Sequence, residues 1–273
     1  MPRPVVALFA AALLIAALAG PAGAITFGQP DGNRHPNVGS IVLDIPEIGL
    51  IQWCSGTLIE DDVFLTASHC TADLDAIVQD FGAEVLITFD PTISVSGTFF
   101  TGAWVTHPLY SGFRGKGGMS DPHDIAVVLL DQSPGLTPAS LPTAGMLEEL
   151  KADGTLRRTR FTAVGYGAVR DTMRTGFEAI QANLDRNYSV QGFNSLTKAW
   201  LSLPMNNTPG RDNGGTCYGD SGGPHFIHLN GAETDIVVSI TVTGDAPCKA
   251  TDRTYRTDTD SARDFLGQYV ELP

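Results

Sequence analysis

One serine stands in surroundings that suit nucleophilic catalysis. Ser221 lies within "GTCYGDSGGP" (Gly215–Pro224), between an aspartate and two glycines. A serine hydroxyl is a poor nucleophile at neutral pH, so it needs a base within hydrogen-bond reach and a third group that orients this base. The chain must therefore supply a histidine and a carboxylate that fold against Ser221.

Two upstream segments offer these partners. "LTASHC" places His69 at the end of an apolar run, and "DPHDIAVVLL" places Asp124 at the start of a strongly apolar one. A carboxylate held beside buried surface suits a group that must stay ionised and orient an imidazole. We therefore predict a catalytic triad in the chain order His69, Asp124, Ser221.

A different arrangement would follow from treating "GDSGG" as the nucleophile elbow of α/β-hydrolases, in which the acid and the histidine come after the serine. Only 273 − 221 = 52 residues follow Ser221, and His225 and His228 lie too close to it in sequence. The chain also lacks the alternation of strands and helices which that fold requires. An esterase of this class is the weaker alternative, beside a non-catalytic binding protein on a protease fold.

Five motifs carry a resemblance to a known family. "CSGTLI", "LTASHC", "DIAVVLL", "VGYG" and "CYGDSGGP" follow one another in the order found in chymotrypsin/trypsin-like serine proteases, and the chain resembles this family from about Ile25 to its end. The resemblance implies two six-stranded antiparallel β-barrels followed by a C-terminal helix. It also implies an endopeptidase that needs no cofactor and no metal ion.

The same resemblance implies roles for the site residues. His69 takes the proton of Ser221 and later gives it to the leaving amine, Asp124 fixes the imidazole tautomer, and Ser221 forms the acyl-enzyme. The N–H groups of Gly219 and Ser221 form the oxyanion hole. Glycine at 219 fits a turn in which a Cβ would oppose the required backbone conformation.

Four cysteines allow three pairings, and none has the C-x-x-C spacing of zinc or redox sites. The resemblance pairs Cys54 with Cys70 and Cys217 with Cys248. The first disulfide would hold the His69 loop, and the second would brace the wall of the specificity pocket.

The N-terminus predicts export and activation. Residues 1–24 combine Arg3, an apolar run and small residues at 22 and 24, which is typical of a signal peptide cleaved after Ala24. Cleavage there would leave Ile25 with a free ammonium group. By resemblance this group pairs with a buried Asp220, so we expect signal peptidase itself to complete activation. Phe27 departs from the family, where glycine is usual.

Specificity is predicted from the residues around the serine. By resemblance Gly215 lies at the base of the pocket for the side chain before the scissile bond (P1), and its lack of a carboxylate argues against arginine or lysine at P1. Thr216 lies beside it. Arg253 either lines the pocket or faces solvent, while Ser239 and Thr241 match the segment that lies along the substrate.

The remaining pattern predicts the elements that hold these residues. Short β-rich runs such as "SIVLDI", "EVLITF", "RFTAVGYG" and "TDIVVSITV" alternate with turn residues, as in an all-β protein. We expect barrel one at about 25–138, barrel two at about 139–258, and a C-terminal helix at about 259–271. Only "AGMLEELKA" also looks helical. The irregular segment 169–194 is expected to be a surface loop or a substrate-contacting loop.

Composition excludes some partners. The formal net charge is −13, and loss of residues 1–24 removes one arginine, giving 16 − 30 = −14. So acidic a chain repels nucleic acid and anionic membranes. We expect a secreted monomer, free of the membrane after signal cleavage, whose partners are protein or peptide substrates and protein inhibitors.

Overall fold

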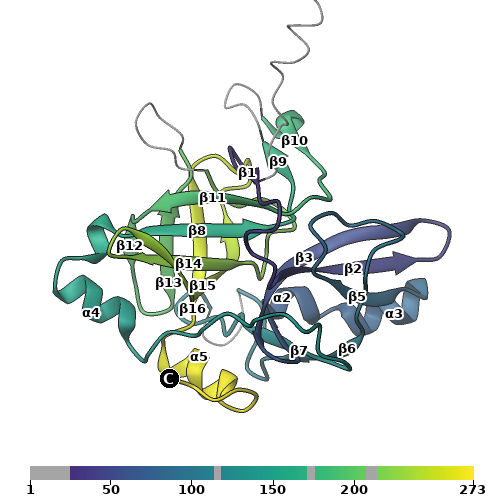
Figure 1. Cartoon of the computed structure of the whole chain (residues 1–273), viewed down its shortest axis with the longest axis horizontal. Coiled ribbons are helices and arrows are strands. Elements are labelled where there is room, and N and C mark those ends of the chain that lie inside the picture. The colour runs from purple at the N-terminus through teal and green to yellow at the C-terminus, as the bar shows by residue number, and fades with distance from the viewer. Residues whose placement is uncertain (1–24, 114–117, 171–175, 207–213) are drawn as a thin grey trace, which may run out of the picture.

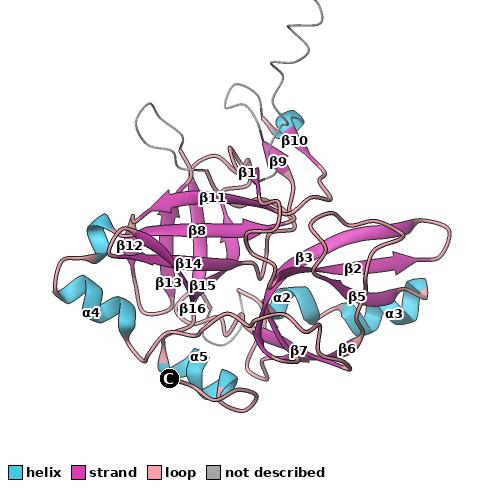
Figure 2. Ribbon diagram, in the orientation of Figure 1, coloured by secondary structure: helices cyan, strands magenta, loops and turns pink. Residues whose placement is uncertain are grey.

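Two antiparallel sheets build the molecule. The computed structural model describes residues 25–113, 118–170, 176–206 and 214–273. Figure 1 shows a six-stranded sheet on the right and an eight-stranded sheet on the left, and Figure 2 shows how few helices accompany them. No helix among these residues is long and apolar enough to span a membrane.

The first sheet has the order β5-β2-β3-β4-β7-β6. Its end strands meet, because Ile87 of β5 exchanges two backbone hydrogen bonds of 2.8 Å with Phe100, just before β6. The sheet therefore closes on itself as a barrel. Its strands are β2 (Val38–Ile45), β3 (Gly49–Glu60), β4 (Val63–Thr66), β5 (Glu84–Thr88), β6 (Gly102–Thr106) and β7 (Ala126–Leu130).

The second sheet has the order β1-β11-β8-β14-β15-β16-β13-β12. It also curls, because Nε2 of Gln191 on β11 lies 3.1 Å from Oδ2 of Asp252 on β16 although three strands separate them in the sheet. Its strands are β1 (Gln29–Pro30), β8 (Arg160–Gly165), β11 (Asn187–Gly192), β12 (Ser195–Leu196), β13 (Trp200–Pro204), β14 (Pro224–Leu229), β15 (Ala232–Gly244) and β16 (Thr251–Arg256).

The all-β fold with its C-terminal helix is as expected, but three details differ. The second sheet has eight strands, where the expected barrel has six. Residues 29–30 pair with β11 and so belong to the second sheet, not to the first. Segment 169–194 is not one loop: it contains the small pair β9 (Val169–Arg170) and β10 (Ile180–Gln181), with the 3₁₀ turn Phe177–Ala179 directly before β10, and then β11. The buried side chains of β11 are polar, so this strand lacks the alternation of apolar and polar residues by which a strand is recognised in a sequence.

Helices pack at the edges of the sheets. α5 (Asp260–Leu266) begins after Thr259, whose hydroxyl accepts the N–H of Ala262, and it buries Phe265 in the main core. α4 (Met146–Ala152) was also expected. Two helices were missed, α2 (Ser68–Thr71) and α3 (Leu74–Phe81), and a 3₁₀ turn covers Leu156–Arg158.

Candidate active site

Short buried strands place His69 and Asp124 together. Thr66 at the end of β4 pairs with Ala126 at the start of β7, so the residues that follow β4 lie next to those that precede β7. Ser68 strengthens this junction, since its hydroxyl donates to the carbonyl of Ile125 at 2.6 Å. His69, on α2, therefore lies beside Asp124.

Both carboxylate oxygens of Asp124 bind His69. The backbone N–H of His69 donates to Oδ1 at 2.8 Å, and Nδ1 of the imidazole lies 2.9 Å from Oδ2. Asp124 is fully buried, whereas the His69 side chain keeps about a quarter of its surface exposed. A proton on Nδ1 satisfies Asp124 and leaves the lone pair of Nε2 free to act as a base.

Ser221 faces the same cavity as His69. The two side chains line a cavity of about 400 Å³. The carbonyl of Ser221 accepts the N–H of Ser55 on β3 at 2.8 Å, which ties the serine loop to the first sheet. Oγ of Ser221 and the imidazole of His69 form no hydrogen bond in the structure, and such bonds often tighten only when substrate is bound.

The turn at Gly219 leaves two N–H groups free. Gly219 has φ +94°, and a Cβ there would lie 2.1 Å from Oε1 of Gln52. Its carbonyl accepts hydrogen bonds from Nε2 of Gln52 at 2.9 Å and from the hydroxyl of Ser55 at 3.0 Å. Within the described part of the chain, no acceptor binds the N–H of Gly219 or of Ser221. A substrate oxyanion could occupy that position.

Asp220 is fully buried beneath this turn. Its Oδ1 accepts the N–H of Gly167 at 2.8 Å and its Oδ2 accepts the N–H of Cys217 at 2.9 Å. Burial raises the pKa of the Asp220 carboxyl to about 7, and the negative charge of Asp252 adds to this, against the two N–H groups. A Cβ at Gly165 or Gly167 would collide with Asp220, so the glycines of "VGYG" make room for this carboxyl group.

The start of the described chain lies against the base of the predicted P1 pocket. Ile25 is fully buried, and Thr26 exchanges two backbone hydrogen bonds with Gly215, of 2.8 and 2.9 Å. Ile25 and Phe27 both have positive φ, +66° and +54°. Such values strain residues that carry a Cβ, which explains the preference for glycine at position 27 that the resemblance implies.

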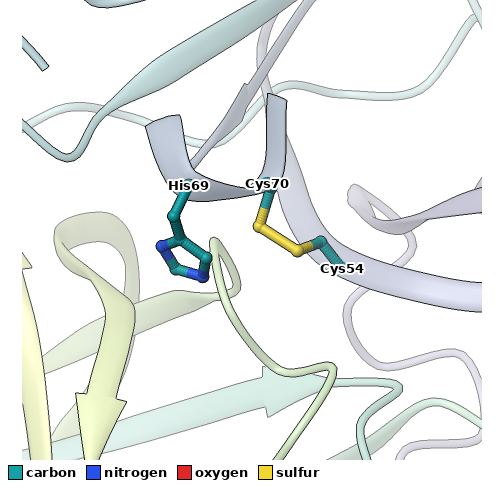
Figure 3. Close-up of side chains that lie close together, drawn as sticks. All are labelled: Cys54, His69 and Cys70. Carbon is teal, nitrogen blue, oxygen red and sulfur yellow. A yellow bond between two sulfur atoms is a disulfide. The ribbon is translucent and has the colours of Figure 1, made fainter. Parts of the chain in front are cut away.

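The two disulfides are those expected, Cys54–Cys70 and Cys217–Cys248. Figure 3 shows the first beside His69, whose imidazole and the disulfide leave α2 in different directions. Ligand atoms of Cys54, His69 and Cys70 lie close enough together to suggest a metal site. Both sulfur atoms are in the disulfide, however, so no thiolate is present to bind a metal ion.

The structure brings only some of the predicted substrate-binding residues to the cavity. Thr216 and Thr241 line it, whereas Gly215, next to Thr216 in the chain, is not among its lining residues. Ser239 does not: it is fully buried, and its hydroxyl accepts that of Thr254 at 2.8 Å. Arg253 does not either, because its guanidinium group stacks 5.7 Å from the ring centre of Trp200.

Sequence reasoning missed much of the cavity wall. Tyr218 and the segment 242–246 line it, and the hydroxyl of Tyr218 donates to the carbonyl of Ala246 at 3.0 Å. A tyrosine three residues before the nucleophile was the available signal. No sequence signal marked segment 242–246, because the register of this segment depends on a β-bulge between Thr241 and Thr243.

Comparisons with known proteins agree with this geometry. The family model described as Trypsin matches residues 31–266. Brachyurin from Leptuca pugilator is 29% identical over 207 residues, which are 73% of this chain and 78% of brachyurin. A solved structure of HL collagenase has a TM-score of 0.61 at 15% identity and covers 92% of this chain and 99% of its own. The antiparallel fold rules out the α/β-hydrolase alternative. The chain belongs to the trypsin family and is a serine endopeptidase.

Proposed function

We propose that His69, Asp124 and Ser221 are the catalytic triad of this endopeptidase. The observation that carries the proposal is the double contact of Asp124 with His69, whose imidazole lines the cavity that also holds Ser221. Nε2 of His69 takes the proton of Ser221 as Oγ attacks the peptide carbonyl. The protonated imidazole then passes this proton to the leaving amine, and water attacks the acyl-enzyme by the same route.

The N–H groups of Gly219 and Ser221 would bind the oxyanion of each tetrahedral intermediate. Their freedom from other acceptors supports this role, as does the carbonyl of Gly219, which Gln52 and Ser55 hold in place. Donors fixed in advance need no reorganisation when charge develops. Each such donor is worth about 3 kcal/mol in the transition state.

Activation follows from the position of Ile25. In the uncut chain the β-branched residue Ile25 holds φ +66°. The fully buried Asp220 accepts hydrogen bonds from the backbone N–H groups of Gly167 and Cys217. Cleavage after Ala24 removes the constraint on φ and creates an ammonium group on a buried residue. We propose that export by signal peptidase thereby activates the enzyme, through an ion pair between Ile25 and Asp220.

The P1 side chain is proposed to be uncharged. Gly215 offers no carboxylate, and residues with charged side chains are scarce in the cavity wall, where Asp245 uses both oxygens on backbone N–H groups of Lys249, Ala250 and Thr251. An arginine or lysine side chain would lack a paired charge there.

A peptide library tests the function. The purified, secreted protein is incubated with peptides of diverse sequence, beside its Ser221→Ala variant, and the products are read by mass spectrometry. We expect cleavage that the variant lacks, after uncharged residues, from protein whose N-terminal residue is Ile25. Cleavage that persists in the variant would overturn the triad, and an active protein with another N-terminus would overturn the activation step.

A further inference from the structure

A sealed polar centre lies inside the second barrel, behind the predicted P1 pocket. The side chains of Gln191, His225 and Asp252 are all fully buried. Oδ2 of Asp252 lies 3.0 Å from Nε2 of His225 and 3.1 Å from Nε2 of Gln191. The triad described above uses none of these groups.

This centre has unused capacity to bind a donor. Oδ1 of Asp252 is buried and has no hydrogen-bond partner within the described residues. His225 is the partner in the one ion pair of Asp252 that these residues form. The negative charge of Asp252 also contributes to the raised pKa of Asp220. A cationic group that reached Oδ1 would therefore meet a free acceptor with a negative charge.

Met205 lies beside Gly215 together with Gln191, a member of this centre. A Cβ at Gly215 would lie 2.3 Å from Cγ and 2.4 Å from Sδ of Met205, and 3.0 Å from Nε2 of Gln191. The thioether therefore fills the space into which a side chain at 215 would project. Met205 is 1% exposed, so its side chain is buried in that space.

Met205 also contacts the cavity wall from behind. It packs against the disulfide Cys217–Cys248, and both cysteines line the cavity of His69 and Ser221. Asp252 lies opposite Gly244 of the same wall in the β15–β16 pairing. The thioether of Met205 and the carboxylate of Asp252 thus both lie behind one wall of the cavity.

We propose that Met205 is a plug that determines the P1 specificity of this endopeptidase by keeping Asp252 out of reach. The inference rests on the proposed function, with Gly215 at the base of the P1 pocket. With the plug in place, a P1 side chain meets an apolar thioether and uncharged residues are preferred. Without it, the ammonium group of a P1 lysine could reach Oδ1 of Asp252.

Two peptides that differ only in lysine or leucine at P1 test the plug. The readout is the ratio of their kcat/KM values, with enzyme concentration fixed by titration of Ser221. We expect Met205→Ala to raise the lysine-to-leucine ratio at least about tenfold, and Asp252→Asn in that background to return it to near the wild-type value. Met146→Ala, in a separate core cluster on α4, is the matched control and should leave the ratio unchanged.

Two results would overturn the plug. One is an unchanged ratio in Met205→Ala, or in the milder Met205→Val if the alanine variant does not fold. The other is a lowered ratio in Asp252→Asn with Met205 intact, because Asp252 would then already contact the substrate. If the wild-type protein cleaves neither peptide in a Ser221-dependent manner, the proposed function itself fails and the plug with it.

Discussion

The contact between His69 and Asp124 decides what the imidazole can do. Asp124 has no exposed surface, and both of its oxygens are occupied by one residue, the backbone and the ring of His69. The carboxylate therefore fixes the orientation of the ring as well as its tautomer. In the proposed mechanism Ser221 is the nucleophile and depends on this pair for its reactivity.

Asp124→Asn tests the role of the carboxylate. An amide N–H₂ facing Nδ1 favours the opposite tautomer, so Nε2 carries the proton and cannot act as a base. We expect kcat/KM for a peptide substrate to fall about 10⁴-fold. The melting temperature reports whether the fold is kept, and a loss of less than about tenfold in folded protein would show that Asp124 is not the orienting acid.

Because Asp220 is buried, we predict that the free energy of unfolding depends on pH differently in the uncut and the processed protein. In the uncut chain its folded-state pKa is raised to about 7 from 3.8, so between these values the folded state binds the proton that the unfolded state has lost. Stability should therefore fall as pH rises from about 4 to about 7, by on the order of 4 kcal/mol. An ammonium group at Ile25 would lower this pKa and remove the loss.

Urea unfolding across this pH range measures the difference. The two proteins carry Ser221→Ala to prevent self-cleavage, and one begins at Ile25 while the other keeps Ala24. Equal pH profiles for the two would contradict the pairing of Ile25 with Asp220.

At the scale of elements, α2 holds the proposed base, and the hydroxyl of Ser68 is one of the groups that join this helix to its surroundings. Ser68 donates to the carbonyl of Ile125 at 2.6 Å and accepts the N–H of His107 at 3.1 Å, all in buried surroundings. The hydroxyl thus connects α2, the start of β7 and the segment after β6. Together with the disulfide of Cys70 and the hydrogen bond between Thr71 and Thr106, it holds these four residues of helix in place.

Ser68→Ala should lower the free energy of unfolding by about 1–3 kcal/mol, because it leaves a buried donor and a buried acceptor unpaired. Urea denaturation in the Ser221→Ala background measures this. Ser133→Ala is the control, since Ser133 is exposed and its loss should cost less than about 0.5 kcal/mol. Equal effects of the two substitutions would mean that Ser68 does not support α2.

The limits of sequence prediction also lie at this scale. Motif order predicted the sheets, the residues His69, Asp124 and Ser221 that the fold draws together, and the disulfides. It could not predict the face of β16 on which Arg253 lies, because side chains alternate and a shift of one residue reverses every face. The strand places Arg253 against Trp200 and Asp252 inside the barrel. No sequence motif marks Met205, because its importance comes only from its packing against Gly215 in the folded chain.

At the scale of the whole molecule, a closed barrel and a curled eight-stranded sheet meet around the cavity. The main core contains residues from both, including Phe64 of β4 and Phe226 of β14. The first barrel supplies His69 and Asp124, and the second supplies Ser221 and the walls around it. The catalytic geometry therefore depends on the packing of the two barrels as well as on each loop.

The overall charge predicts a preference for cationic substrates. Residues 25–273 carry a formal charge of −14, which attracts positive peptides over long distances until salt screens it. For a peptide whose lysines lie away from P1, kcat/KM should fall about threefold or more between 10 and 150 mM NaCl. The same peptide with glutamines in place of these lysines is the control, and equal salt dependence of the two peptides would contradict the attraction.

Labelling by a serine-reactive phosphonate tests the central claim most directly. The secreted protein is treated with the reagent, the modified peptide is identified by mass spectrometry, and the remaining peptidase activity is measured on the same sample. The account predicts one adduct, on Ser221, with activity lost in proportion to labelling and no adduct in His69→Ala. Peptidase activity that survives complete labelling of Ser221, or an adduct on another serine that tracks the loss of activity, would contradict it.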